Sequence, residues 1–149
     1  MRLALFQPDQ AGNVGTIIRL AACLGVSLDL IEPMGFPWGD KALKRAGMDY
    51  AELANVTRHA DWAAFAAGLA GRLVLFTTNG AVRLPEARFE SGDVLLFGSE
   101  SAGVPAAVHE RAELRVRIPQ VAGTRSLNLA VAAGIGVAEA VRQAGAWVR

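Results

Sequence analysis

LALFQPDQAGNVGTIIRLAACLG, residues 3–25, contains a short apolar run, a polar loop and a longer, largely apolar segment, in that order. The run at residues 3–6 predicts a β-strand, and residues 15–24 predict a helix that ends at Gly25. A buried strand followed by a helix is the repeating unit of parallel α/β sheets. This stretch therefore favours an α/β fold.

The same alternation continues towards the C-terminus. Further strands are predicted at residues 27–31, 56–59, 73–77, 94–97 and 114–118, and further helices at residues 41–46, 62–69 and 127–144. Asp40, Asp61 and Ser126 stand directly before these helices and can cap them. We therefore expect a mostly parallel sheet with helices on both faces.

Composition limits the class of protein. The chain has 149 residues, 52% of them hydrophobic and 19% charged, which predicts a single globular domain over residues 1–149. Its apolar runs are shorter than the ~20 residues of a membrane helix, and the N-terminus does not resemble a signal peptide. The one cysteine, Cys23, excludes an internal disulfide and a cysteine-cluster metal site. We expect a cytoplasmic protein without a membrane or metal partner.

The net charge of +1 does not by itself indicate that the protein binds nucleic acid.

Two loops that follow predicted strands carry unusual residues, and ligands of parallel sheets bind at this edge. In the first, Gly12 and Gly15 have the spacing G-x-x-G, which departs from the G-x-G-x-x-G of dinucleotide-binding loops. Arg19 stands among apolar residues of the following helix, so its guanidinium must be paired or border a polar cleft. Glu100 lies in the second loop, residues 98–105, where it can pair with Arg19 or accept a hydrogen bond from a ligand amine.

A third loop belongs to the stretch RIPQVAGTRSLNLAVA, residues 117–132, and leads into the last predicted helix. Ser126 fits a helix N-cap. Asn128 is unexpected in a first helical turn, because asparagine is a poor helix former. The helix that follows is apolar on most sides and rich in Ala and Gly, so it is either buried in the domain or used between subunits.

Together the three loops resemble those of the SPOUT (α/β-knot) RNA methyltransferases. The first motif of that family, N-x-G-x-x-x-R, matches Asn13, Gly15 and Arg19. The second and third motifs of the family resemble FGSESAGVP, residues 97–105, and residues 117–132. Order and spacing agree across all three motifs, and the resemblance covers essentially the whole chain.

Within that family, the segments at residues 31–50 and 56–62 are similar to the minimal tRNA (cytidine/uridine-2′-O-)-methyltransferases of the wobble position. One departure is Ala138, where those enzymes carry a tyrosine in the last helix. The resemblance implies a deep trefoil knot in the C-terminal segment. It also implies a homodimer formed through the C-terminal helix.

The resemblance implies transfer of a methyl group from S-adenosylmethionine to the ribose 2′-OH of tRNA nucleotide 34, a cytidine or a modified uridine. The implied catalytic residues are Arg19, Asn13, Glu100, Ser126 and Asn128. The implied cofactor-binding residues are Phe76, Thr77, Thr78, Gly98, Glu100, Gly103, Ile118, Ser126 and Leu127. The predicted RNA-binding residues are Arg19, Lys41, Lys44, Arg45 and Arg125, of which Lys41, Lys44 and Arg45 share one face of a short helix.

The expected roles follow from the chemistry of these side chains. A guanidinium is a poor base because its pKa lies above ~12, so Arg19 is expected to hold the adjacent phosphate and stabilise the developing alkoxide. Asn13, Ser126 and Asn128 can orient the ribose, and Glu100 can hold Arg19 or the ammonium group of S-adenosylmethionine. The alternatives are a methyltransferase for another tRNA site or rRNA, a dinucleotide oxidoreductase, and a non-catalytic RNA-binding knot protein.

Overall fold

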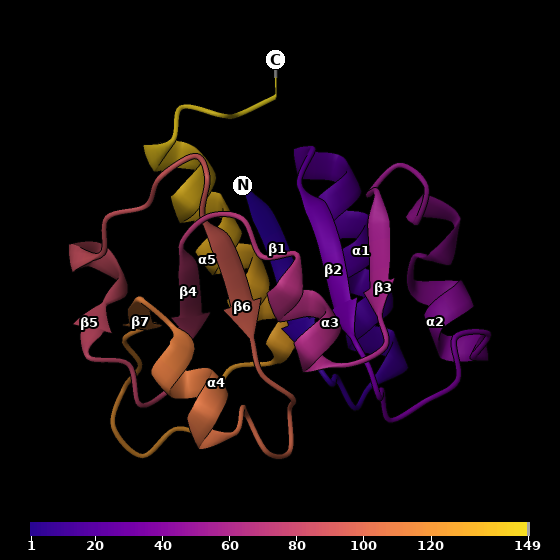
Figure 1. Cartoon of the computed structure of the whole chain (residues 1–149), viewed down its shortest axis with the longest axis horizontal. Helices are drawn as coiled ribbons and strands as arrows, with labels where there is room; N and C mark the ends of the chain where they lie inside the picture. The colour runs from indigo at the N-terminus through magenta and orange to yellow at the C-terminus, as the bar shows by residue number, and fades with distance from the viewer. Residues whose placement is uncertain (149) are drawn as a thin grey trace.

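The computed structural model describes residues 1–148. Its strands form one sheet in the order β3-β2-β1-β6-β4-β7-β5, and every neighbouring pair in this sheet is parallel (Figure 1). The strands are β1 (Arg2–Phe6), β2 (Ser27–Ile31), β3 (Val56–His59), β4 (Leu73–Phe76), β5 (Val82–Arg83), β6 (Val94–Phe97) and β7 (Leu114–Arg117). The predicted α/β class and parallel sheet are therefore confirmed.

Helices stand between most of these strands, and the last helix follows β7. They are α1 (Ala11–Leu24), α2 (Lys41–Ala46), α3 (Trp62–Ala67), α4 (Ala106–Arg111) and α5 (Leu129–Gln143), together with the 3₁₀ helices η1 (Met48–Tyr50) and η2 (Leu84–Glu86). Strands β2, β3 and β6 and helix α2 have the bounds that the sequence predicts. Helix α1 begins four residues before the predicted start at Gly15, and α4 and β5 were not predicted.

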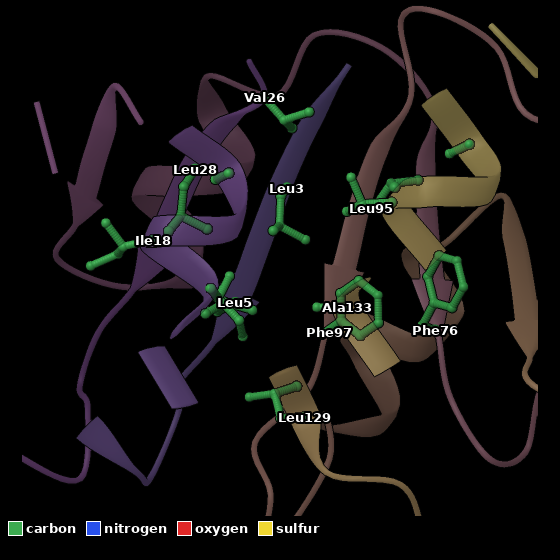
Figure 2. Packing of buried hydrophobic residues seen from close by; sticks show 14 of the residues in the cluster. Leu3, Leu5, Ile18, Val26, Leu28, Phe76, Leu95, Phe97, Leu129 and Ala133 are labelled. Carbon is green, nitrogen blue, oxygen red and sulfur yellow. The ribbon is translucent and has the colours of Figure 1, made fainter. Parts of the chain in front are cut away.

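Alternate residues of the central strands enter two apolar clusters. In β1, Leu3 and Leu5 join a cluster that contains residues of α1, α2 and α5, including Ala133. Ala4 and Phe6 join a second cluster with residues of α3 and α4. Figure 2 shows part of the first cluster, in which Leu3 and Leu5 lie between side chains of α1 and the C-terminal part of the chain. This alternation is what a strand buried on both sides requires.

The cap of α5 differs from the prediction. The sequence predicts that Ser126 caps this helix from residue 127, but Asn128 is the N-cap and the helix begins at Leu129. Asn128 Oδ1 accepts hydrogen bonds from the backbone nitrogens of Ala130 at 2.8 Å and Val131 at 3.3 Å. Serine and asparagine cap helices about equally well, so residue type alone does not choose between them. The cap role also explains an asparagine at the start of an apolar helix.

Helices α1 and α2 touch through their backbones. A Cβ on Gly47 would collide with the carbonyl oxygen of Gly15, and a Cβ on Gly15 would collide with the Cβ of Ala46. The predicted N-cap of α2 is confirmed, since Asp40 Oδ1 accepts from the backbone nitrogen of Ala42 at 2.7 Å. Two glycines thus bring α2 closer to α1 than larger residues would allow.

Over residues 1–148, two carboxylates are buried, and both are paired. Asp29 accepts hydrogen bonds from Arg2 Nε at 2.8 Å and Nη2 at 2.6 Å, and His59 Nε2 lies 2.7 Å from its Oδ1. Asp93 accepts from Arg72 Nε at 3.0 Å and Nη2 at 2.8 Å. Bidentate pairing of this kind compensates the loss of hydration of a buried carboxylate.

Candidate functional site

A cavity of about 430 Å³ lies at the carboxyl ends of β4, β6 and β7. Its walls come from residues 75–78, 97–100 and 103–104, from residues 116–132 in part, and from Gln10 and Asn13 of the first loop and helix. The volume falls in the range of ~300–1,000 Å³ that small-molecule sites occupy. The cavity is at the sheet edge where parallel α/β proteins bind ligands.

Two phenylalanines contribute to the cavity wall. Phe76 and Phe97 both line the cavity, and their rings stack on each other with centroids 4.6 Å apart and planes at 11°. Phe89 stacks on the Phe76 ring with a centroid distance of 6.0 Å. Gly136 of α5 lies against the same pair, since a Cβ there would stand 2.7 Å from Phe76 Cζ. Phe76 therefore stacks with two other rings, and the packing of these rings against α5 supports this part of the cavity wall.

A chain of hydrogen-bonded polar side chains lies along the cavity wall and joins all three motifs. Asn13 Nδ2 donates to Glu100 Oε1 at 3.2 Å, and Asn128 Nδ2 donates to Asn13 Oδ1 at 2.9 Å. Each amide has one orientation that fits, because Glu100 accepts from Asn13 and the Asn128 oxygen is occupied by backbone N–H groups of α5. The three side chains are therefore fixed relative to one another.

The second motif forms a tight turn over residues 98–103. The backbone groups of Ser99 and Gly103 exchange two hydrogen bonds, at 3.0 and 2.9 Å. Gly103 has a φ of 64°, and a Cβ on Gly98 would stand 2.6 Å from the Gly103 carbonyl carbon. Both positions need glycine, one for its left-handed backbone and the other for close approach. The turn therefore presents its backbone and Glu100 to the cavity.

Asp9, which the sequence analysis did not single out, braces this turn. Its backbone nitrogen donates to Glu100 Oε2 at 2.7 Å, and its Oδ2 accepts from the Ser101 backbone nitrogen at 2.9 Å and from Ser101 Oγ at 2.6 Å. The hydrogen bonds from the Ser101 side chain and backbone hold the pKa of Asp9 below its ordinary value. Gln10 and Gln120 also line the cavity without having been predicted. Their place directly after strands was the only available signal.

Every residue that the resemblance assigns to the cofactor lines this one cavity. These are Phe76, Thr77, Thr78, Gly98, Glu100, Gly103, Ile118, Ser126 and Leu127. Asn13 and Asn128 from the predicted catalytic set line it as well. The folding of the chain thus brings together residues that are distant in sequence, while their individual roles remain predictions.

Arg19 is the exception. Its side chain is exposed on α1, its guanidinium carbon lies 5.4 Å from the centre of the Tyr50 ring, and it is not among the residues that line the cavity. Of the two roles considered for Glu100, an ion pair with Arg19 is not formed within one chain over residues 1–148, where the two Glu100 oxygens accept hydrogen bonds from Asp9 and Asn13. The Arg19 guanidinium is exposed, so it stays hydrated and needs no ion pair within its own chain.

The other predicted RNA-binding cations are all exposed. Lys41, Lys44 and Arg45 lie on the outer side of α2, opposite the buried Leu43. Arg125 is exposed in the loop before α5, directly before the cavity residue Ser126. Over residues 1–148, none of these four cations forms an ion pair with a carboxylate.

Comparison with known proteins identifies the family. A profile of the SpoU rRNA methylase family matches residues 1–138. The chain belongs to the SpoU rRNA methylase family. This SpoU-family chain is 50% identical to a tRNA (cytidine(34)-2′-O)-methyltransferase of Ancylobacter novellus, in an alignment that covers 100% of the chain and 96% of the relative.

Solved structures agree with the family assignment. A structure that concerns the 2-OH methylation of C/U34 on tRNA superposes on the SpoU-family chain with a TM-score of 0.90 and 44% identity, covering 95% of this chain and 94% of that one. An AdoMet-bound rRNA methyltransferase from Sinorhizobium meliloti gives a TM-score of 0.84 and 32% identity, covering 95% of this chain and 55% of that one.

Two features are absent from the described part of the SpoU-family chain. Over residues 1–148, no helix has the length and apolar character that crossing a bilayer requires. Within the same residues, the His, Cys, Asp and Glu side chains form no group of three that could hold a metal ion.

Proposed function

We propose that this chain transfers a methyl group from S-adenosylmethionine to the ribose 2′-OH of the tRNA wobble nucleotide, a cytidine or a modified uridine at position 34. The observation that carries the proposal is the relationship to the Ancylobacter novellus tRNA (cytidine(34)-2′-O)-methyltransferase, at 50% identity over the full chain. The cavity supports it, because the residues assigned to the cofactor, together with Asn13 and Asn128, gather around one space of suitable volume.

The cavity fits S-adenosylmethionine by its chemistry. The apolar part of the lining, which includes Ile118 and Leu127, suits an adenine, and the turn at residues 98–103 offers backbone groups and Glu100. A carboxylate suits the ammonium group of the methionine part of the cofactor. The residues that would hold the cofactor are Phe76, Thr77, Thr78, Gly98, Glu100, Gly103, Ile118, Ser126 and Leu127. When bound, S-adenosylmethionine supplies a methyl group on a positively charged sulfur.

The protein side chains position and activate the nucleophile. Asn13 and Asn128 are fixed by their shared hydrogen bond, and together with Ser126 they orient the ribose at the cavity. Arg19 binds the adjacent phosphate and stabilises the negative charge that develops on the 2′ oxygen. The proton of the 2′-OH passes to that phosphate or to a water, because the guanidinium remains protonated at neutral pH.

The position of Arg19 leads us to place catalysis between two copies of the chain. Arg19 is exposed and outside the cavity of its own chain, so we assign it to the cavity of a partner in a homodimer. Val131 and Ile135 of α5 are 50% and 38% exposed and supply an apolar surface for that contact. A twofold contact would bring both Arg19 side chains to the opposite cavities at once.

Complementation between variants tests this arrangement. Copies with Arg19→Ala and copies with Glu100→Ala are each expected to be inactive alone. In a mixed dimer, one cavity then has an intact Glu100 from its own chain and an intact Arg19 from the partner. Recovery of methyl transfer on mixing is the expected result. Dimers that mix without any recovery would place Arg19 at the cavity of its own chain.

We further propose one domain over residues 1–149, helices layered on both faces of the sheet, and a deep trefoil knot in the C-terminal segment. The two apolar clusters on alternate strand residues support the layers. The path from β7 through the cavity wall to α5, which packs against α1 and β6, supports the knot. We assign RNA binding to Lys41, Lys44, Arg45 and Arg125. We also propose a cytoplasmic location, which a tRNA substrate supports.

The decisive experiment uses S-adenosylmethionine with a radiolabelled methyl group and unmodified tRNA. Label confined to a 2′-O-methylated nucleotide 34 is the expected result. Label at another tRNA position, or on rRNA only, would retain the reaction and reject the proposed substrate. Wild-type protein that binds no S-adenosylmethionine would reject the function altogether.

A further inference from the structure

The short loop after β1, residues 7–10, holds the tip of the turn at residues 98–103. One carboxylate oxygen of Asp9 accepts two hydrogen bonds from Ser101, at 2.9 Å from the backbone nitrogen and at 2.6 Å from Oγ. The backbone nitrogen of Asp9 donates to Glu100 Oε2 at 2.7 Å. Asp9 therefore binds two consecutive residues of the second motif, from an element 91 positions away in sequence.

Asp9 is itself supported from behind. The carbonyl oxygen of Pro8 accepts from the Gly35 backbone nitrogen at 2.9 Å, and the Gln7 backbone nitrogen donates to the Ile31 carbonyl oxygen at 2.9 Å. A Cβ on Gly35 would stand 2.8 Å from the Asp9 carbonyl oxygen, so the loop after β2 packs directly on Asp9. These contacts hold the backbone of Asp9 in place, so Asp9 can in turn hold Ser101.

The tip of the turn at residues 98–103 is held mainly by bonds to other parts of the chain, since the internal hydrogen bonds of the turn lie at its base. Its internal hydrogen bonds join Ser99 to Gly103 and Ala102 to Ser99, which close the base of the turn. Ser101 and Ala102 at its tip are exposed. Within the described residues, the side-chain hydrogen bonds that tie the tip to the rest of the domain run to Asp9 and Asn13.

We propose that Asp9 is a positioning residue for the cofactor cavity. By holding Ser101 and Glu100, it keeps the 98–103 turn against the 7–10 loop and so sets the position of one cavity wall. Asp9 does not line the cavity, and it acts on the cofactor through Glu100 and the turn. This inference rests on the proposed function, since it takes S-adenosylmethionine as the ligand of the cavity. The carboxylate suits the role because an ionised acceptor binds N–H and O–H donors more strongly than a neutral one.

The test measures S-adenosylmethionine affinity by titration calorimetry for Asp9→Ala, Ser101→Ala and the double variant. Asp9→Ala is expected to weaken binding about tenfold, since two hydrogen bonds to a charged acceptor are removed. Ser101→Ala removes only the bond from Oγ and keeps the one from the backbone nitrogen, so it should weaken binding less than Asp9→Ala does. The double variant should be no weaker than Asp9→Ala alone, because that change already removes both bonds. Asp9→Glu retains the carboxylate and is expected to rescue most of the affinity. The KM for S-adenosylmethionine should rise in Asp9→Ala more than kcat falls.

Asp61→Ala is the matched control. Asp61 also accepts a backbone hydrogen bond at 2.8 Å, from Ala64 at the start of α3, but it is absent from the cavity lining. This variant should lose thermal stability and keep its affinity for S-adenosylmethionine. If Asp9→Ala behaves in the same way, or if the Asp9 and Ser101 effects simply add, the positioning role is wrong. If the wild-type protein itself fails to bind S-adenosylmethionine, the proposed function fails, whatever the variants do.

Discussion

Asn128 Nδ2 donates a hydrogen bond of 2.9 Å to Asn13 Oδ1, and this contact joins the N-cap of α5 to the first turn of α1 across 115 positions of sequence. The oxygen of the same Asn128 amide accepts from two backbone nitrogens of α5. One side chain therefore both starts the last helix and completes the polar chain of the cavity. The cap uses Oδ1 of the amide and the bond to Asn13 uses Nδ2, so substitutions can separate the two roles.

The first prediction separates these duties at position 128. Asn128→Ser keeps a good N-cap but loses the amide donor to Asn13, so stability should stay close to wild type while methyl transfer falls. Asn128→Ala loses both and should also lower the free energy of unfolding by about 1 kcal/mol. Urea denaturation and single-turnover methyl transfer measure the two effects. Equal activity of Asn128→Ser and wild type would show that the bond to Asn13 has no part in the reaction.

A second prediction concerns Gly136. A Cβ there would stand 2.7 Å from Phe76 Cζ and 3.1 Å from Phe97 Cζ, so Gly136→Ala should push the stacked rings towards the cavity. Overpacking of this kind is expected to cost about 1–3 kcal/mol of stability and to weaken binding of S-adenosylmethionine. Calorimetric titration and chemical denaturation of the purified variant measure both quantities.

Gly134→Ala is the control for Gly136→Ala in the same helix. The nearest atom to a Cβ at Gly134 is Leu20 Cδ2 at 4.0 Å, which is ordinary contact distance. Alanine forms helices better than glycine, so this variant should gain up to about 1 kcal/mol. A loss of stability at Gly134 as large as at Gly136 would show that the rings are not the cause.

Removal of Arg72 tests the buried carboxylate Asp93. Arg72→Met leaves Asp93, which is 1% exposed, without its bidentate partner. Breaking a buried pair from one side costs about 3–5 kcal/mol. The double variant with Asp93→Leu should be more stable than Arg72→Met alone, because no unpaired charge remains buried. Denaturation midpoints in urea give the order. If Arg72→Met is as stable as the double variant, the Asp93 carboxylate is not left buried without a partner.

The fourth prediction is a pH dependence. Hydrogen bonds from Arg142 and Gln143 lower the pKa of Glu139 from 4.5 to about 2. A carboxylate with a lowered pKa in the folded state contributes stability above its unfolded pKa, and this contribution is lost as pH falls from 4.5 towards 2. Glu139→Gln should therefore lose less thermal stability than wild type over that acid range. Scanning calorimetry from pH 6 to pH 2 measures this difference, with Glu110→Gln, at an exposed carboxylate, as control.

The fifth prediction tests the cations of α2. Replacing Lys41, Lys44 and Arg45 with glutamine should weaken tRNA binding and flatten its salt dependence, by about 0.7 in log–log slope for each phosphate that is no longer neutralised. Arg83→Gln is the matched control, because its guanidinium is already paired with Glu86 at 3.2 Å. Filter binding across a salt series gives the slopes. An unchanged slope in the triple variant would remove α2 from the RNA interface.

Local sequence signals predicted much of the fold. Apolar runs with flanking polar residues predict β2 and β6 with their observed bounds, and Asp40 marks the start of α2. The start of α1 was missed because Gln10 makes no side-chain cap, so nothing local announces the helix. Strand β5 has two residues and exists through its pairing with β7. Such elements depend on tertiary contacts that no local pattern encodes.

The candidate site shows the same division. The motifs place Asn13, Glu100 and Asn128 at the ends of predicted strands and helices, and the structure brings them together in one cavity. The sequence leaves open whether Glu100 pairs with Arg19 or with a ligand amine, and it gives no sign of the bonds that Glu100 accepts from Asp9 and Asn13 within one chain. Any residue of a short polar loop can donate a hydrogen bond from its backbone nitrogen. Which of them reaches Glu100 depends on how the loops pack in the fold, and the sequence alone does not show it.

The backbone contact between Gly15 and Gly47 has a consequence for the RNA. It seats α2 directly on α1, so the spacing between the three cations of α2 and Arg19 is set by the packing of these two helices. If the two helices meet the RNA as one unit, less of the loss of conformational entropy falls on the protein and more on the nucleic acid strand. Anticodon loops whose curvature already matches that spacing would bind with the smallest loss. Selection among RNAs would then depend on the shape of the loop as well as on its bases.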